Sequence, residues 1–262
     1  MLNLKPQDLM ESHLLIKRLE EIASSLERRT HALALIGLGS VGLDLDRLDA
    51  YSDLDFFVIV EPGYKQAYLN DLQWLQEVSP IAYSFANTRD GYKLLFADHI
   101  FCEFAVFEPD ELQHIPFAPG RIVWKQPHAP AALSQPLIAP PVPVKHDPNW
   151  LLGEALTNLL VGMARDKRGE KLSAMRFIQG FAVDRLLELA DYITRAQDVP
   201  KDAFANERRF EQIYPEIARE LPVFMQGYAR NSESALAILD FLERNFSVNT
   251  EMAAAIRKLC AE

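Results

Sequence analysis

ALALIGLGS (residues 32–40) and SDLDFFVIV (residues 52–60) are the two stretches of sequence that decide the fold. Each contains a short apolar run that is typical of a buried strand; the first ends in a Gly-Ser turn, and the second begins with two carboxylates. Side chains at positions i and i+2 of a strand face the same way, so Asp53 and Asp55 point together out of one sheet face, beside Gly39 and Ser40. Backbone N–H groups that hold phosphate, next to paired carboxylates that hold Mg²⁺, indicate a site for a nucleoside triphosphate.

The composition is that of an ordinary folded protein. Of 262 residues, 49% are hydrophobic and 24% charged, and the net charge of −10 disfavours general nucleic-acid binding because it repels phosphate backbones. Two cysteines and six scattered histidines predict neither a disulfide framework nor a zinc site. The apolar runs are too short to span a bilayer, and the N-terminal residues lack a signal-peptide pattern. We therefore expect a cytoplasmic protein with no membrane partner.

The first half of the chain mixes helical and strand patterns. Thr88 to Gly91 are turn residues between two short apolar runs and predict a hairpin. The pattern predicts an α+β fold, in which an N-terminal α/β domain with a mixed sheet of about five strands precedes a C-terminal, all-α helical bundle. We expect helices over residues 6–29 and 66–77, and strands over residues 32–36, 53–60, 81–85, 92–96, 99–107 and 121–124.

Prolines separate the two halves. Nine of the 16 prolines fall between Pro116 and Pro148, and this density predicts a stiff, extended connector that packs along a surface. Asp147 before Pro148 predicts a helix start, because Asp caps exposed N–H groups and Pro suits a first turn. The predicted domains are 1–127, a Pro-rich connector over 128–148, and the helical bundle over 149–262. Helices are expected over residues 151–163, 172–195, 207–220, 232–246 and 251–260.

Glu103 is the third candidate carboxylate. It is the only charged residue in the apolar run from Ile100 to Phe107, and burying an unpaired carboxylate is costly. It therefore either pairs with another group or binds a cation together with Asp53 and Asp55. The alternative is a Glu on an edge strand that faces water or an Arg. Likewise, Asp53 and Asp55 alone fit a polar loop that leads into a strand, and Gly39-Ser40 alone fits a simple tight turn.

Taken together, these residues resemble the nucleotidyltransferase superfamily with the DNA polymerase β-like fold. The motif of that superfamily is a hydrophobic strand, Gly-Ser, two acids that alternate with apolar residues, and a third acid on another strand. Here these are Gly39-Ser40, Asp53-Leu54-Asp55-Phe56 and Glu103. Tyr51-Ser52-Asp53 and Cys102-Glu103-Phe104 look like the lincosamide and aminoglycoside nucleotidyltransferase branch. The resemblance covers about residues 30–110; the helical half matches mainly in layout.

The resemblance implies an enzyme that uses one or two Mg²⁺ ions to transfer NMP, from ATP or another nucleoside triphosphate, to a hydroxyl of a small molecule. Gly39 and Ser40 would bind the triphosphate, Asp53 and Asp55 would hold the metal, and Glu103 would complete the metal site or accept the proton of the hydroxyl. The acceptor implied is a lincosamide- or aminoglycoside-like antibiotic. The sequence leaves the nucleotide and a homodimer open.

Two further features bear on phosphate binding. The loop over residues 41–51 is longer and more acidic than in many relatives, and Arg47 is its only cation. Two alternatives to transfer onto a small molecule remain. This loop allows a catalytically silent nucleotide-binding module, and antitoxin-type relatives suggest an enzyme that nucleotidylates a protein. Arg168 and Lys171 lie in a polar break between two predicted helices. They either contact phosphates at a cleft edge or belong to a solvated turn.

Overall fold

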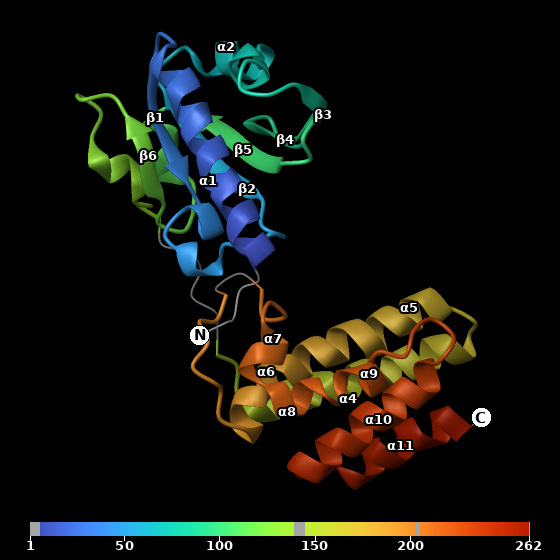
Figure 1. Ribbon diagram of the computed structural model, residues 1–262. Coiled ribbons are helices and arrows are strands. Elements are labelled where there is room, and N and C mark those ends of the chain that lie inside the picture. The colour runs from blue at the N-terminus through green and yellow to red at the C-terminus, as the bar shows by residue number, and fades with distance from the viewer. Residues whose placement is uncertain (1–5, 139–144, 203–204, 262) are drawn as a thin grey trace. The chain divides into compact units, whose positions relative to one another are not determined.

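The computed structural model describes residues 6–138, 145–202 and 205–261, with the backbone alone for residues 6–12. The chain forms two compact units, Met1–Pro140 and Pro141–Glu262. The first carries a mixed sheet and the second is helical (Figure 1), so the predicted α+β class is confirmed. Among the described residues, no helix has both the length and the apolar character needed to cross a membrane.

The sheet of the first unit has six strands in the order β3-β4-β5-β2-β1-β6. β2 and β5 pair in parallel, and the other neighbours are antiparallel. The expectation of about five strands is close to this number, and the strand expected over residues 121–124 is β6, which pairs with β1 at the edge of the sheet. The predicted hairpin is confirmed as β3–β4. The strands are β1 Ala32–Gly37, β2 Leu54–Val60, β3 Ile81–Ala86, β4 Gly91–Phe96, β5 Phe101–Phe107 and β6 Arg121–Lys125.

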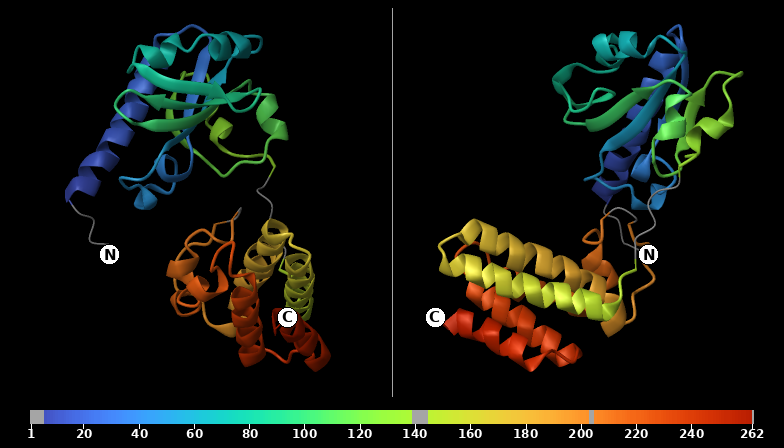
Figure 2. Two further views of the ribbon diagram at one scale, coloured as in Figure 1. Left: turned by 90° about the vertical axis from the view of Figure 1, so that its right-hand side faces the viewer. Right: turned by 180° about the vertical axis from the view of Figure 1, so that it is seen from behind.

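Helices cover one face of this sheet (Figure 2), and they are α1 (Pro6–Glu27), α2 (Lys65–Asn70) and α3 (Gln73–Gln76). The core beneath them is aromatic: the Phe56 and Phe104 rings stack with centroids 5.3 Å apart, and Trp74 meets both edge-on. The single helix expected over 66–77 is wrong. Asp71 takes extended backbone angles, and its carboxylate accepts a hydrogen bond from the Gln73 N–H, so the chain ends one helix and starts another.

The opposite face of the sheet has a second, smaller core built from loops and single turns. Ile36 and Ile59 of the strands pack there with Phe117, Ala129 and Leu133. The last two belong to the proline-rich stretch, which therefore packs on the sheet as far as it is described. The short 3-10 turns of this unit are η1 Gly39–Val41, η2 Leu45–Arg47, η3 Glu111–His114 and η4 Ala131–Ser134.

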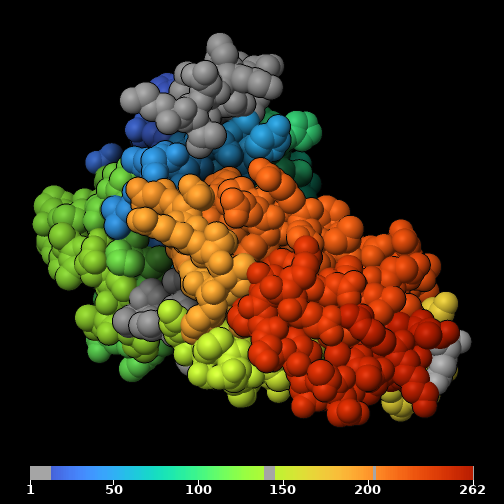
Figure 3. Space-filling view, turned by 90° about the horizontal axis from the view of Figure 1, so that it is seen from below, coloured from blue at the N-terminus to red at the C-terminus, as the bar shows by residue number. Residues whose placement is uncertain are grey.

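The second unit is a bundle in which α4 (Pro148–Lys167) packs against α10 and α11, whose atoms are orange-red to red in Figure 3. Asp147 caps α4 as predicted, since its carboxylate accepts from the Asn149 and Trp150 N–H groups. The helix expected over 207–220 is wrong: Pro215 disfavours helical angles at Tyr214, and short helices replace it. The others are α5 Lys171–Met175, the π-helix η5 Arg176–Ala182, α6 Val183–Ile193, α7 Phe210–Ile213, α8 Pro215–Ala218, α9 Leu221–Phe224, α10 Asn231–Asn245 and α11 Thr250–Ala261.

Candidate active site

The two predicted aspartates lie where β2 begins. Leu54 and Phe56 are buried in the core beneath the helices, so alternation places Asp55 on the other face of the sheet. Asp53 immediately precedes the strand and lines a cavity of about 650 Å³. The Asp55 carbonyl oxygen accepts a hydrogen bond of 2.8 Å from the Leu38 N–H, which fixes the start of β2 against the residue before the Gly-Ser turn.

The Gly39-Ser40 turn lies beside the Asp55 carboxylate. Gly39 has a φ of +51°, a left-handed conformation that glycine adopts without steric cost. Among the described residues, a Cβ added at Gly39 would meet one atom within 4 Å, the Asp55 Oδ2 at 3.9 Å. The turn continues as η1, and the first N–H groups of such a turn have no partner within it. The structure thus brings backbone donors and a carboxylate together at one end of β1 and β2.

Glu103 lies opposite Asp55 on the neighbouring parallel strand. Partners in a parallel ladder share a sheet face, so the two carboxylates are on the same side. β5 lies between β4 and β2, so Glu103 is not on an edge strand, although its side chain is partly exposed and pairs with a cation. The Glu103 carboxylate is occupied on both oxygens: Oε2 is 3.1 Å from the Lys93 Nζ, and Oε1 accepts a 2.8 Å hydrogen bond from the Asn87 Nδ2.

The sequence did not predict Lys93 and Asn87 as residues of this site. Lys93 is the cross-strand partner of Glu103 on β4, and Phe85 is the partner of Lys93 on β3. Phe85, Lys93, Glu103 and Asp55 therefore form one row across four strands. A signal was present, because the predicted turn over 88–91 sets the register of Phe85 and Lys93. The pairing of β4 with β5 has no such local signal.

The donor set fits a hard divalent cation in part. Asp53 and Asp55 offer the carboxylate oxygens that Mg²⁺ prefers, and the Gly39 turn leaves space beside Asp55. The Glu103 carboxylate contacts Lys93 and Asn87. Across the described part of the chain, no three His, Cys, Asp or Glu side chains are placed so that they would hold a metal ion. The fit therefore rests on the two aspartates.

Apolar, aromatic and polar side chains line the cavity beside Asp53, and the polar ones include Ser52 and His99. Leu14 and Leu15 of α1, Tyr51 before β2, and Ile100 and Phe101 at the start of β5 line it. Its far wall includes Asp98, whose Oδ2 is 2.5 Å from the Arg18 Nη2. The Arg18 hydrogen bonds hold the pKa of Asp98 below its ordinary value, although burial acts in the other direction. A ligand with a planar or apolar part fits such a lining.

The predicted phosphate-binding cations belong to two different units of the chain. Arg47 is in η2 of the sheet unit, where its Nη1 is 2.8 Å from the Asp44 Oδ2. Arg168 caps the C-terminal end of α4, and Lys171 begins α5, so both belong to the helical unit. Arg168 is exposed and donates to the Ala164 carbonyl at the end of its own helix. Their contact with phosphates stays a prediction.

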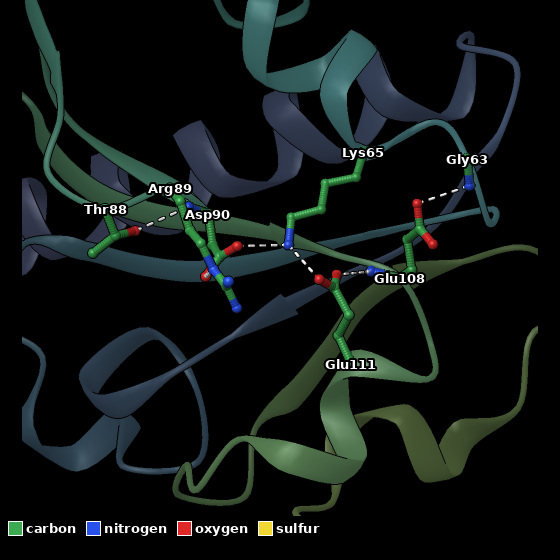
Figure 4. Close-up of polar contacts among 7 residues, drawn as sticks. All are labelled: Gly63, Lys65, Thr88, Arg89, Asp90, Glu108 and Glu111. Carbon is green, nitrogen blue, oxygen red and sulfur yellow. Dashed lines mark hydrogen bonds and ion pairs between the residues drawn. The ribbon is translucent and has the colours of Figure 1, made fainter.

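A polar cluster clamps the far ends of the two site strands (Figure 4). Lys65, just after β2, donates hydrogen bonds of 2.6 Å to Asp90 before β4 and to Glu111 after β5. Burial lowers the pKa of Lys65, but these two bonds outweigh it and leave the pKa raised. Burial raises the pKa of Asp90, but the Lys65 and Arg89 contacts outweigh it and leave that pKa lowered. This cluster holds β2 and β5 in the register that pairs Asp55 with Glu103.

Comparison with known proteins gives several likenesses among solved structures, two of which are described here. No protein-family model and no curated protein sequence matches the chain. An aminoglycoside 6-adenyltransferase from Bacillus subtilis is 12% identical over 94% of this chain and 91% of its own, with a TM-score of 0.31. A STING-associated CdnE c-di-GMP synthase from Capnocytophaga granulosa is 12% identical over 97% of this chain and 79% of its own, with a TM-score of 0.33. Likenesses at this level identify neither a substrate nor an activity of this chain.

Proposed function

We propose that this protein is a nucleotidyltransferase. It would transfer NMP, from ATP or another nucleoside triphosphate, to a hydroxyl of a small-molecule acceptor and release pyrophosphate. One observation carries the proposal: Asp55 lies beside the Gly39-Ser40 turn and opposite Glu103 on one sheet face. Backbone donors, a metal-binding carboxylate and a second carboxylate are thereby adjacent, and nucleotidyl transfer needs all three.

Each group has a defined task in this reaction. The Gly39 and Ser40 N–H groups and the Ser40 hydroxyl would donate to the triphosphate, with Arg47 as the nearest cation in sequence. Asp53 and Asp55 would hold Mg²⁺, which when bound neutralises negative charge on the phosphates. The cavity beside Asp53 would receive the apolar part of the acceptor.

The bond changes balance without any further reactant. The acceptor oxygen forms a bond to the α-phosphorus, and the bond from that phosphorus to the β-phosphate oxygen breaks, so pyrophosphate leaves. The proton of the hydroxyl passes to Glu103, which lies on the same face as Asp55, and from there to water. Every step uses side chains of the sheet unit.

The test is transfer of label from α-³²P nucleoside triphosphates. Each of ATP, GTP, CTP and UTP is incubated with the full chain, Mg²⁺ and a panel of aminoglycosides, lincosamides and proteins. We expect a labelled small molecule with the wild type and at least about a hundredfold less with Asp53→Asn or Asp55→Asn, as for loss of a group that stabilises the transition state. Asp46→Asn is the matched control, because Asp46 is an exposed acid of the neighbouring loop. Equal losses in all three variants would refute the assignment.

A second candidate is a nucleotide-binding module without catalysis. The pairing of Lys93 with Glu103 and of Arg47 with Asp44 favours it, because both pairs neutralise groups that the transfer reaction would use. Calorimetric titration with ATP and Mg²⁺ separates the two. Binding that depends on Asp53 and Asp55, without transfer to any acceptor, supports the silent module. Label on a protein of the panel instead supports a protein-nucleotidylating enzyme.

A further inference from the structure

Glu103 is held by the β3–β4 hairpin and not by its neighbour on β2. Both of its carboxylate oxygens contact hairpin residues, Lys93 at 3.1 Å and Asn87 at 2.8 Å. Asp55 lies on the other side of β5, at the same level of the sheet. The third acid is therefore already engaged with a cation of the chain, on the side that faces away from Asp55.

We propose that Lys93 is an internal counter-ion that competes with a divalent cation for Glu103 and so sets the affinity of the site for that cation. The proposal rests on the proposed function, which places the cation at Asp53 and Asp55. With Lys93 in place, the site binds metal through the two aspartates. Without it, Glu103 becomes a third ligand. Lys93 is thus a positioning residue, which acts on the metal through Glu103.

The strength of the ion pair allows this exchange. The Lys93 and Glu103 side chains are 39% and 41% exposed, and ion pairs exposed to that extent are weak because water screens them. A divalent cation carries twice the charge of the ammonium group and accepts several oxygen ligands at once. A bound metal can therefore compete with Lys93 for the Glu103 carboxylate. Lys93 lowers the affinity that Glu103 adds to metal binding, but it does not abolish that binding.

Asn87 supplies a second observation that points to a ligand here. Its Nδ2 donates to Glu103, but its Oδ1 is buried and has no hydrogen-bond partner among the described residues. Buried polar oxygens are nearly always paired, by protein or by ordered water or ions. The hairpin therefore leaves an oxygen ligand unsatisfied on the same side chain that donates to the Glu103 carboxylate.

A double-variant cycle on metal binding tests the proposal. Mn²⁺ replaces Mg²⁺ because its free form gives an electron paramagnetic resonance signal, and titrations with the full chain report its dissociation constant. We expect Lys93→Met to tighten Mn²⁺ binding at least about threefold, the scale of losing one exposed ion pair. Lys93→Gln should do the same if the Met variant folds poorly, and Lys93→Arg should restore the wild-type affinity.

The remaining variants separate the causes. In an Glu103→Gln background, Lys93→Met should change the dissociation constant by less than about twofold, because the weak through-space effect of one screened charge remains. Arg89→Gln, which removes an exposed positive charge from the same hairpin, should leave the affinity unchanged. Circular dichroism of each variant shows whether its fold is retained.

Three results would overturn the proposal. Equal tightening with and without Glu103 would mean that Lys93 acts by charge alone. Unchanged or weaker binding in Lys93→Met and Lys93→Gln would mean that it does not compete. No Mn²⁺ binding in any variant would refute both this proposal and the proposed function. Mn²⁺ binding that survives Asp53→Asn and Asp55→Asn would refute the proposed function separately.

Discussion

Replacing Lys65 with methionine tests whether the polar cluster holds the two site strands together. In the wild type, the Lys65 Nζ bridges Asp90 and Glu111, with 2.6 Å to each carboxylate (Figure 4). The Lys65 ammonium group also lies 5.1 Å from the centre of the Phe107 ring. Methionine keeps most of the apolar part of the lysine side chain. The substitution therefore removes mainly the charge and the two hydrogen bonds.

The structure sets the size of the loss. The three side chains are 14%, 22% and 36% exposed, so the cluster lies between a surface pair and a buried one. Exposed pairs contribute roughly 0.2–1 kcal/mol, and breaking a buried pair costs roughly 3–5 kcal/mol. We expect Lys65→Met to lower the free energy of unfolding of the sheet unit by about 2 kcal/mol at pH 7.

The pH dependence has a definite sign. The pKa of Asp90 is lowered in the folded state, so its stabilisation is complete above its unfolded pKa and is lost as pH falls through the folded pKa. The pKa of Lys65 is raised, so its stabilisation is complete below its unfolded pKa and is lost as pH rises through the folded one. In the variant, two partly buried carboxylates face each other and take up a proton more readily. The difference between wild type and variant should be constant from about pH 7 to 9 and shrink toward about pH 4.

Urea unfolding followed by tryptophan fluorescence measures this difference. A Trp150→Phe background leaves Trp74 and Trp124 as reporters, both in the sheet unit. A loss of about 2 kcal/mol should lower the urea midpoint by about 1 M. Lys17→Met is the control, since Lys17 forms only an exposed i,i+4 pair with Glu21 and should lose no more than about 0.5 kcal/mol. A variant as stable as this control, or a difference that grows on acidification, would refute the reasoning.

Three further outcomes follow from single contacts. Burial raises the pKa of the Cys102 thiol to about 12, so Ellman's reagent at pH 8 should titrate one of the two thiols in the native chain, Cys260, and both in denaturant. Asp147→Ala removes the cap of α4 and should cost about 1 kcal/mol of helical-unit stability in urea. Gly39→Ala forces a side chain into φ +51° with open space around it, so it should cost about 1 kcal/mol from strain alone and weaken ATP binding in calorimetry; unaltered ATP affinity would remove Gly39 from the site.

The sequence predicted the elements whose signals are local. β1 and β2 are apolar runs that are flanked by glycines or by a Pro-Gly turn, and the β3–β4 hairpin has turn residues between its strands. The cap at Asp147 lies one residue before a proline that suits a first helical turn. In each case, a few adjacent residues determine the conformation, so periodicity and turn chemistry were sufficient.

Two predicted helices are wrong because their apolar periodicity continues across a residue that interrupts the helix. Residues 207–220 have a helical pattern of apolar residues, yet Pro215 removes an N–H donor and restricts Tyr214, so the helix divides there. Asp71 divides residues 66–77 in a similar way, since its side chain caps the following turn in place of continuing the preceding one. Both signals were readable in the sequence and were given too little weight.

The arrangement around Glu103 depends on contacts that no local pattern reports. The Glu103 side chain is 41% exposed, so burial does not force a partner on it, yet its carboxylate pairs with Lys93 on one face of β5. Whether the partner is a metal or a lysine depends on the pairing of β4 with β5, and that pairing is decided by long-range packing. β2 and β5 are parallel, and two helices and a hairpin lie between them in the sequence, so the pairing of Asp55 with Glu103 is a long-range contact that no local pattern reports. Lys93 reaches Glu103 from a strand that is adjacent in sequence, so its ion pair needs only an antiparallel β4–β5 pairing. A cation at Asp55 would therefore have to compete with the Lys93 ammonium group for the Glu103 carboxylate.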